Sequence, residues 1–161
     1  YIFVMKDGKI QQFGTPIDIY DEPVNRFVAD FIGESNIVEG TMVEDFVVNI
    51  YGQNFDCVDM GITENKKVEV VIRPEDISLV SQNDGLFKAK VDSMLFRGVH
   101  YEICCKDRKG YEWVIQSTKK ANVGSEVGLY FEPEAIHIMV PGETEEEFDK
   151  RIESYEDYHH A

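Results

Sequence analysis

The sequence is poor in basic residues and in long apolar runs. Its 16 Lys and Arg face 31 Asp and Glu, which gives a formal net charge of −15. Phosphate backbones and anionic membrane surfaces attract clustered Lys and Arg, so the charge disfavours nucleic acid and anionic membranes as partners. The longest apolar stretch falls well short of the roughly 20 residues that a transmembrane helix needs.

Cysteine is also scarce, and its placement argues against a disulfide framework. The three cysteines are Cys57, Cys104 and Cys105. Their number is odd and two are adjacent in a predicted strand, where side chains alternate between faces. The spacing does not match that of zinc ligands. No charged segment followed by an apolar run opens the chain, so we expect a cytoplasmic protein.

Known catalytic motifs are missing as well. The sequence contains no glycine-rich phosphate loop followed by Lys and Ser or Thr, and no Gly-x-Ser-x-Gly motif. We expect His100 and His137 to be ordinary strand residues, and His159 and His160 to belong to a solvated end. The residues alone therefore indicate no catalytic, cofactor or metal site.

The composition is nevertheless that of a folded protein, with 43% apolar residues, ten Phe and eight Tyr. The negative charge is unevenly spread: residues 1–36 carry −3, residues 37–142 carry −6 and residues 143–161 also carry −6. We expect this charge run to form a solvated face or a solvated tail. The spacing of Phe148, Ile152 and Tyr155 allows a helix there.

The first 36 residues predict a β-hairpin followed by two short helices. Tyr1–Met5 and Ile10–Phe13 are β-prone, and Asp7-Gly8 suits the turn between them. Thr15 before Pro16 predicts a helix start, and that helix should stop near Glu22. A second helix is predicted to begin at Pro23 and to end at Gly33, with apolar positions at Val24, Phe27, Val28, Phe31 and Ile32.

From residue 37 onward the pattern changes to short strands separated by turns. Many short strands at this spacing predict a mainly β fold, either a small barrel or a sandwich. The expected strands are residues 37–43, 46–50, 55–58, 67–72, 87–91, 101–105, 111–115, 127–131 and 136–140.

An internal repeat divides this β region. Residues 68–80 align with residues 127–139 at an offset of 59, with four of the thirteen positions identical. The β region therefore consists of two related halves, roughly 37–80 and 86–140. In each repeat a Pro-Glu pair follows a strand, and proline ends a central strand because it has no N–H to donate. We assign a structural turn role to Arg73, Pro74 and Glu75, and to Pro133 and Glu134.

Two motifs carry a family resemblance. The stretch VMKDGKIQQFGTP at residues 4–16, followed by FVADFIG at residues 27–33, closely resembles the end of the nucleotide-binding domain of ABC importer ATPases. The remainder, with Ile72-Arg73-Pro74-Glu75-Asp76-Ile77, resembles the C-terminal regulatory domain of those subunits, an OB-like β-barrel called TOBE. Within the family, the chain is most similar to the ATPases that import spermidine and putrescine.

The resemblance implies three parts: residues 1–36 as the end of a nucleotide-binding domain with linker helices, 37–142 as a TOBE-type OB-like domain, and 143–161 as an acidic tail. It implies a regulatory and dimerisation function on the inner face of the cell membrane. The implied partners are a second copy, the nucleotide-binding domain of the same subunit and, through it, membrane permeases. ATP and Mg²⁺ belong to the longer subunit. Its catalytic motifs would precede Tyr1, so we expect no ATPase activity from this chain.

Three alternatives remain open. The module is a small-ligand sensor if acidic and aromatic side chains bind a polyamine, for which the candidates are Asp76, Tyr101, Glu102, Glu112 and Trp113. Some relatives of such β-modules bind molybdate, although the net charge disfavours an oxyanion. OB-type nucleic-acid binding lacks the basic groove that it requires.

The resemblance also has a structural consequence for residues 1–36. In a nucleotide-binding domain this hairpin would pair with a larger sheet, so here it should leave open edges and an apolar face. We expect this segment and its helix face to be stabilised by dimer contacts, by strand exchange or by packing on the β region.

Overall fold

The computed structural model describes residues 1–160, and side chains as far as Ser154. The chain is mainly β, as the strand pattern predicts. It divides into two compact units: unit 1 contains residues 1–71 and the chain from residue 136 onward, and unit 2 contains residues 72–135. Each unit is built around one five-stranded antiparallel sheet.

The N-terminal segment of unit 1 folds largely as its motifs predict. Strands β1 (Ile2–Lys6) and β2 (Lys9–Gly14) form a hairpin. Asp7 and Gly8 turn the chain with φ of 51° and 76°, the left-handed values that an Asp-Gly turn accepts. Helix α1 (Pro16–Asp21) begins at Thr15, whose Oγ1 accepts a hydrogen bond from the N–H of Asp18 at 3.2 Å.

The second helix starts later than predicted. Helix α2 spans Arg26–Ile32 rather than beginning at Pro23. The side chain of Asn25 caps it by accepting a hydrogen bond from the N–H of Val28 at 3.0 Å. The N–H of Val24 donates to Gln12 Oε1 at 2.8 Å, which holds the preceding residues outside the helix. The helix ends at Gly33, whose φ of 168° is extended rather than left-handed.

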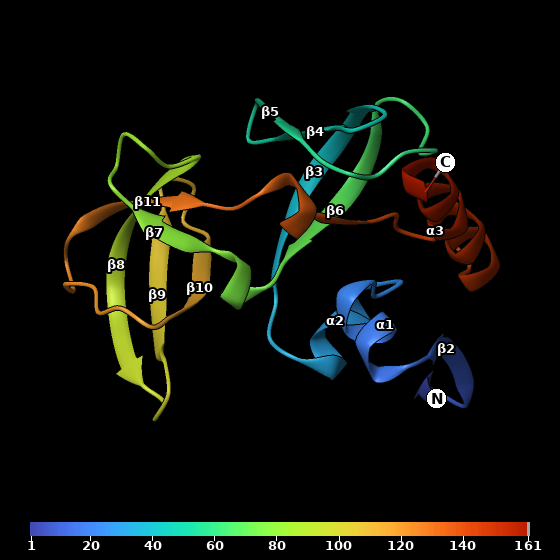
Figure 1. Cartoon of the computed structure of the whole chain (residues 1–161), viewed down its shortest axis with the longest axis horizontal. Helices are drawn as coiled ribbons and strands as arrows, with labels where there is room; N and C mark the ends of the chain where they lie inside the picture. The colour runs from blue at the N-terminus through green and yellow to red at the C-terminus, as the bar shows by residue number, and fades with distance from the viewer. Residues whose placement is uncertain (161) are drawn as a thin grey trace. The chain divides into compact units, whose positions relative to one another are not determined.

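The sheet of unit 1 has the order β12-β6-β3-β4-β5. Figure 1 labels four of these strands, β3 to β6. Its strands are β3 (Asn36–Glu44), β4 (Val47–Ile50), β5 (Gln53–Asp56), β6 (Lys66–Ile72) and β12 (His137–Met139). Residues Tyr51 and Gly52 make the turn between β4 and β5 with φ of 54° and 80°. This turn is shorter than the four residues that the sequence suggested.

The sheet of unit 2 has the order β10-β9-β8-β11-β7. Its strands are β7 (Ser78–Val80), β8 (Phe87–Phe96), β9 (Tyr101–Asp107), β10 (Glu112–Ser117) and β11 (Glu126–Tyr130). Strand β8 continues five residues beyond the predicted end at Val91, because a bulge between Val91 and Ser93 lets it keep pairing with β9.

The two sheets have equivalent strand orders and exchange their last strands. Strand β7 follows β6 in the chain but pairs with β11, and β12 follows β11 but pairs with β6. The two pairings have the same register. Leu79 lies opposite Leu129, and Val70 lies opposite Ile138. The offset of 59 residues relates Val70 to Leu129 and Leu79 to Ile138. Each sequence half, 37–80 and 86–140, therefore contributes its last strand to the sheet of the other half: β7 joins the sheet of unit 2, and β12 joins the sheet of unit 1.

The cores of the two units differ in composition. Unit 2 has an aromatic centre in which Trp113 stacks on Phe87 and Phe131, with ring centroids 5.7 and 6.4 Å apart. In unit 1, two clusters consist mostly of aliphatic side chains. One contains Ala29, Ile37, Val71 and Met139, and the other contains Val4, Ile19, Val24, Val28 and Phe148.

The acidic segment forms a helix, as the spacing of its apolar residues allows, and its described side chains leave one face solvated and one face packed. Helix α3 spans Glu145–His160, and Thr144 Oγ1 accepts a hydrogen bond from the N–H of Glu147 at 3.2 Å. Phe148 is 3% exposed and Arg151 is 7% exposed. The spacing of apolar residues outweighed the charge because only one face of the helix needs to be solvated. Within residues 1–160, no helix has both the length and the apolar character to cross a membrane.

Candidate functional site

The residues proposed for a polyamine site all lie in unit 2 but on different parts of it. Asp76 is exposed in the short turn η1 (Pro74–Asp76). Tyr101 begins β9, and its ring lies 5.1 Å from that of Phe96. Glu102 forms an ion pair with Arg97, with Oε2 2.6 Å from Nη2.

The other two candidates lie near the opposite end of the β9–β10 hairpin. Glu112 is exposed opposite Lys106, and Trp113 lies opposite Cys105, whereas Tyr101 lies opposite Ser117. Trp113 is fully buried. The structure therefore does not bring the five residues into one site, and the ring of Trp113 is not available to a ligand.

Asp107 is the polar centre of this hairpin and was not identified from the sequence. Its Oδ2 accepts a hydrogen bond from Trp113 Nε1 at 2.9 Å. Its Oδ1 accepts from the N–H groups of Lys109 and Tyr111 at 2.9 and 3.0 Å. A buried carboxylate with three donors is well satisfied, so Asp107 fixes the turn and the tryptophan and has a structural role.

The proposed turn residues occupy the two connections that pass between the sheets. Pro74 and Glu75 lie in η1, and Pro133 and Glu134 lie in η2 (Pro133–Ala135). The turns are closed by backbone hydrogen bonds from Asp76 to Arg73 and from Ala135 to Glu132, both at 3.0 Å. Arg73 is 6% exposed, so it is part of the packed connection.

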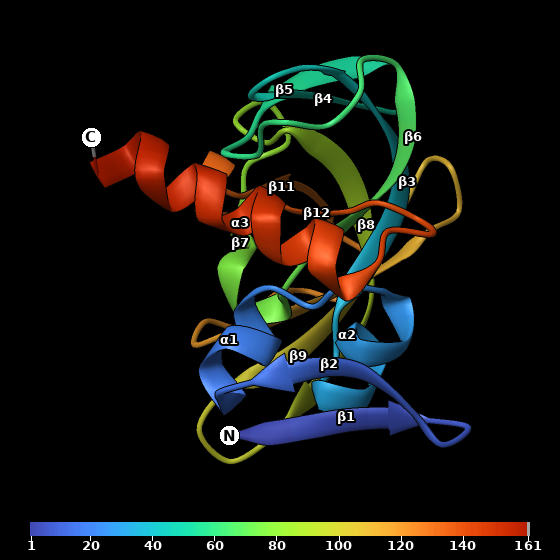
Figure 2. The same cartoon turned by 90° about the vertical axis from the view of Figure 1, so that its right-hand side faces the viewer.

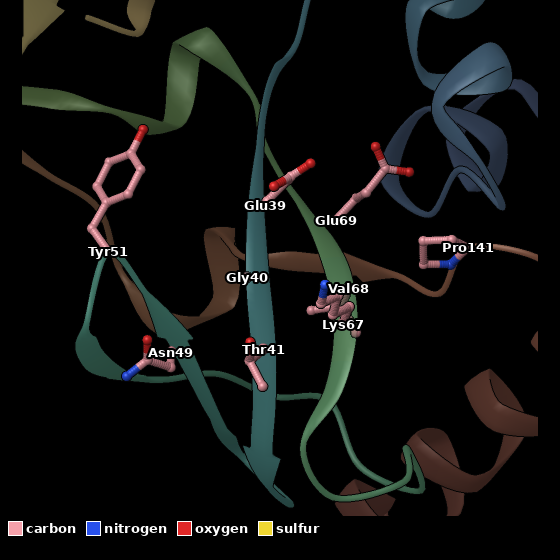
Figure 3. A pocket seen from close by; sticks show the side chains of 9 residues that line it. All are labelled: Glu39, Gly40, Thr41, Asn49, Tyr51, Lys67, Val68, Glu69 and Pro141. Atoms are coloured by element: carbon pink, nitrogen blue, oxygen red, sulfur yellow. The ribbon is translucent and has the colours of Figure 1, made fainter. Parts of the chain in front are cut away.

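An open groove lies on the outer face of the unit 1 sheet (Figure 3). Its volume is about 620 Å³. Strand alternation creates it: Val68 and Val70 point into the core, so Lys67 and Glu69 face outward. The lining residues are Glu39, Gly40, Thr41, Asn49, Tyr51, Lys67, Val68, Glu69 and Pro141.

Charge in the groove is concentrated on two neighbouring strands. Glu39 on β3 and Glu69 on β6 project on the same side of the sheet in Figure 3, with Tyr51 across the groove. Arg26 of α2 reaches Glu69, with Nη2 2.6 Å from Oε2. Glu39 forms no ion pair within the described residues. The alternation of residues 37–43 and 67–72 was the signal that could have revealed these outward-facing acids.

A buried ion cluster joins α3 to the rest of unit 1. Arg151 Nη2 and Nε lie 2.9 and 3.0 Å from the carboxylate oxygens of Glu143. Its Nη1 donates to Asp59 Oδ2 at 3.2 Å, and its Nη2 also donates to the carbonyl of Ile138 at 3.2 Å. The fork of the guanidinium thus meets three acceptor groups at once. The position of Arg151 three residues after Phe148 was the sequence signal for its burial.

A second, smaller pocket of about 430 Å³ lies beside this cluster. Its lining includes Lys66, Lys150, Glu147 and Ser154 in addition to Arg151 and Glu143. Three bases and two acids line it, and Arg151 is already engaged by protein acceptors. The small excess of positive charge is carried by the exposed Lys66 and Lys150.

Two buried thiols and two other groups have raised pKa values. Burial raises the pKa of Cys57 and of Cys105 to about 12 each, so both remain protonated near neutral pH. The hydrogen bond to Glu132 raises the pKa of the Tyr130 hydroxyl. Burial raises the pKa of Asp149, and the nearby Glu153 adds to the effect. In the part of the chain that the structure describes, no three His, Cys, Asp or Glu side chains could hold a metal ion.

Sequence comparison identifies part of this architecture. Residues 70–139 match the family described as the TOBE domain. The matched segment begins within β6 and ends at the last residue of β12, so it contains both exchange connections and the sheet of unit 2. The chain therefore contains a TOBE/OB-type domain.

A solved structure shares the fold. A crystal structure of the cytoplasmic molybdate-binding protein ModG with molybdate bound superimposes with a TM-score of 0.54 and 14% identity. The match covers 66% of this chain and 96% of that chain. At this identity the likeness concerns the fold, which confirms the mainly β fold expected from the strand pattern and the OB-like architecture that the resemblance implies.

Proposed function

We propose that the chain is the regulatory and dimerisation module of the ATP-binding subunit of an ABC importer, one that serves polyamine uptake. The main support for this proposal is that the N-terminal segment and the TOBE-type strands pack together in unit 1. The hairpin and helices that resemble the end of a nucleotide-binding domain pack against TOBE-type strands, through Ala29 with Val71 and Met139. Such packing suits a module that transmits changes between a nucleotide-binding domain and a regulatory β-domain.

The outer face of the hairpin supports a protein partner. The side chains of Tyr1, Phe3 and Phe13 stack on one another, with ring centroids 5.1 and 4.6 Å apart. Phe3 and Phe13 are nevertheless 59% and 44% exposed. An exposed aromatic ladder of this kind is typical of a surface that another protein covers. The nucleotide-binding domain of the same subunit is the partner that the sequence resemblance favours.

Self-association and the lack of turnover are directly testable. We expect two copies of the chain carrying different affinity tags to purify together when they are mixed, because dimerisation belongs to the proposed function. We also expect no release of phosphate from ATP above a blank without protein. Separate elution of the two tagged forms would contradict the first expectation, and ATP turnover would contradict the second.

A small-ligand sensor is the second candidate function, and the groove of unit 1 favours it. Glu39, Glu69 and Tyr51 together offer charge and an aromatic face to an organic cation. Lys67 and Arg26 in the same region allow only modest affinity, since they compete for the carboxylates. We therefore propose this groove as the polyamine site, in place of the five residues of unit 2, which lie apart from one another.

Binding of an oxyanion is the competing version of the sensor function. It is favoured by the shared fold with a protein that binds molybdate, and disfavoured by a net charge of −15. Calorimetric titrations with spermidine and with molybdate distinguish the two. Saturable spermidine heat that survives added salt and is lost in Glu39→Gln supports the groove, whereas salt-screened heat reports only a diffuse acidic surface. Saturable molybdate heat would support the oxyanion version.

A further inference from the structure

We propose that α3 is a releasable clasp, held by Arg151, that fixes the N-terminal hairpin and α1 onto the sheet of unit 1. Undocking of α3 would free that segment while both sheets stay folded. The biological role of this movement rests on the proposed regulatory function. The contacts that hold α3 in place do not, because they all lie within unit 1.

Helix α3 contacts the N-terminal segment directly. Its Phe148 completes an apolar cluster with Val4 of β1, Ile19 of α1 and Val28 of α2, against which Ile152 also packs. Its Glu145 Oε1 accepts a hydrogen bond from the N–H of Phe13 in β2 at 3.0 Å. Figure 2 shows α3 passing over β12 on the side where α1 lies. One helix therefore covers three parts of the segment.

The same helix is anchored to the sheet by Arg151. The guanidinium binds Asp59, which is 2% exposed, and the carbonyl of Ile138 in β12. It also lies 5.4 Å from the ring centroid of Phe148, so the anchor and the apolar contact support each other. Phe148 in turn lies edge-on to His137, at 6.2 Å between ring centroids. Loss of Arg151 therefore affects both sides of the clasp.

The cost of removing Arg151 favours undocking over unfolding. Without the guanidinium, the carboxylates of Asp59 and Glu143 would remain buried without their cation, which is strongly unfavourable. Both regain water if α3 leaves the surface, whereas the sheet hydrogen bonds do not depend on the helix. The segment Val140–Thr144 includes Gly142 with φ of 82°, a suitable hinge for such a movement.

Other contacts limit which part of the segment is released. Helix α2 keeps its ion pair from Arg26 to Glu69 and its contact from Ala29 to Val71. His137 Nε2 stays 2.8 Å from the carbonyl of Pro23. Docking of α3 should therefore stabilise β1, β2 and α1 more than α2. A general loss of stability would affect all four elements, so the difference between them distinguishes the two cases.

Hydrogen exchange measured by mass spectrometry on the full chain tests the proposal. In Arg151→Ala we expect amides of β1, β2, α1 and α3 to exchange at least about tenfold faster, because local opening sets their exchange rate. Amides of β3, β4 and β8–β11 should keep wild-type rates. Lys150→Ala is the matched control, since Lys150 pairs with the exposed Glu146, and it should leave all rates unchanged.

Two further variants keep the test decisive if Arg151→Ala does not fold. Arg151→Lys keeps the charge but lacks the fork, and Glu143→Gln removes one acceptor, so both should give intermediate acceleration in the same peptides. Acceleration confined to α3, or spread equally over both sheets, would overturn the proposal. The same samples are examined for self-association: a chain that fails to dimerise but shows the expected exchange pattern contradicts the proposed function and not the clasp.

Discussion

Unit 1 and unit 2 share a strand order and an exchanged strand, yet they are stabilised by different chemistry. Unit 2 is self-contained, with Trp113 stacked between Phe87 and Phe131 and bonded to Asp107. In unit 1 the N-terminal segment and α3 pack together around Phe148, and Arg151 anchors α3 to the rest of the unit. A duplicated β-unit can thus keep its topology while its two copies take different roles. One copy is stabilised by its own core, and the other binds additional elements of the chain.

Removal of the tryptophan should have the largest effect. Trp113→Ala leaves a cavity in the centre of unit 2, and we expect it to lower the free energy of unfolding by about 3–5 kcal/mol. Urea unfolding followed by circular dichroism measures this, since Trp113 is the only tryptophan and its fluorescence is lost in the variant. A loss below about 1 kcal/mol would mean that unit 2 is not organised around this ring.

Neutralisation of the buried carboxylate should rank second. Asp107→Asn keeps the shape but replaces charged acceptors by an amide that presents only one oxygen to three donors. We expect a loss of about 1.5–3 kcal/mol, the range of hydrogen bonds to charged groups. The same urea experiment applies, with Asp56→Asn on the exposed end of β5 as the control. An equal loss in both variants would contradict a special role for Asp107.

Two glycines test whether the sheets tolerate added volume equally. A Cβ at Gly128 would lie 2.5 Å from the Ser81 carbonyl oxygen and 2.8 Å from Gly85 Cα, all backbone atoms of unit 2. A Cβ at Gly40 would lie 2.9 Å from the carbonyl oxygen of Asn49 in unit 1. We expect Gly128→Ala to lower the thermal unfolding midpoint more than Gly40→Ala, with a cost of about 1–3 kcal/mol. The reverse order would show unit 1 to be the tighter sheet.

Ionisation of the buried thiols should have the smallest effect on stability at moderate pH. Burial raises the pKa of Cys57 in unit 1 and of Cys105 in unit 2 to about 12, above the value of 9.0 expected for an exposed thiol. The folded state therefore holds these protons more tightly, so the stabilisation is complete below pH 9 and is lost as pH rises toward 12. We expect a thiol reagent at pH 8 to label the half-buried Cys104 first. Equal labelling of all three would contradict the burial of the other two.

Local patterns predicted much of the fold because they depend on neighbouring residues. The Asp7-Gly8 turn, the Thr15 cap and the repeat of residues 68–80 and 127–139 each correspond to an observed element. The pairing partner of β7 and β12 was not predictable, because exchange changes no local preference. Arg151 was overlooked because the acidic residues around it suggested a solvated tail, although its spacing from Phe148 placed it on the buried face.

Site prediction was less successful for a similar reason. Charge and aromaticity selected Glu112 and Trp113, but adjacent residues of a strand face opposite sides, and only one of them is exposed. The groove that contains Glu39 and Glu69 depends on β3 lying beside β6, a relation that no single segment reveals.

Light scattering over a dilution series measures whether this module associates with itself. We expect a mass twice the 18.5 kDa of one chain, falling toward the mass of one chain only at high dilution. A mass of one chain at every concentration would contradict this expectation.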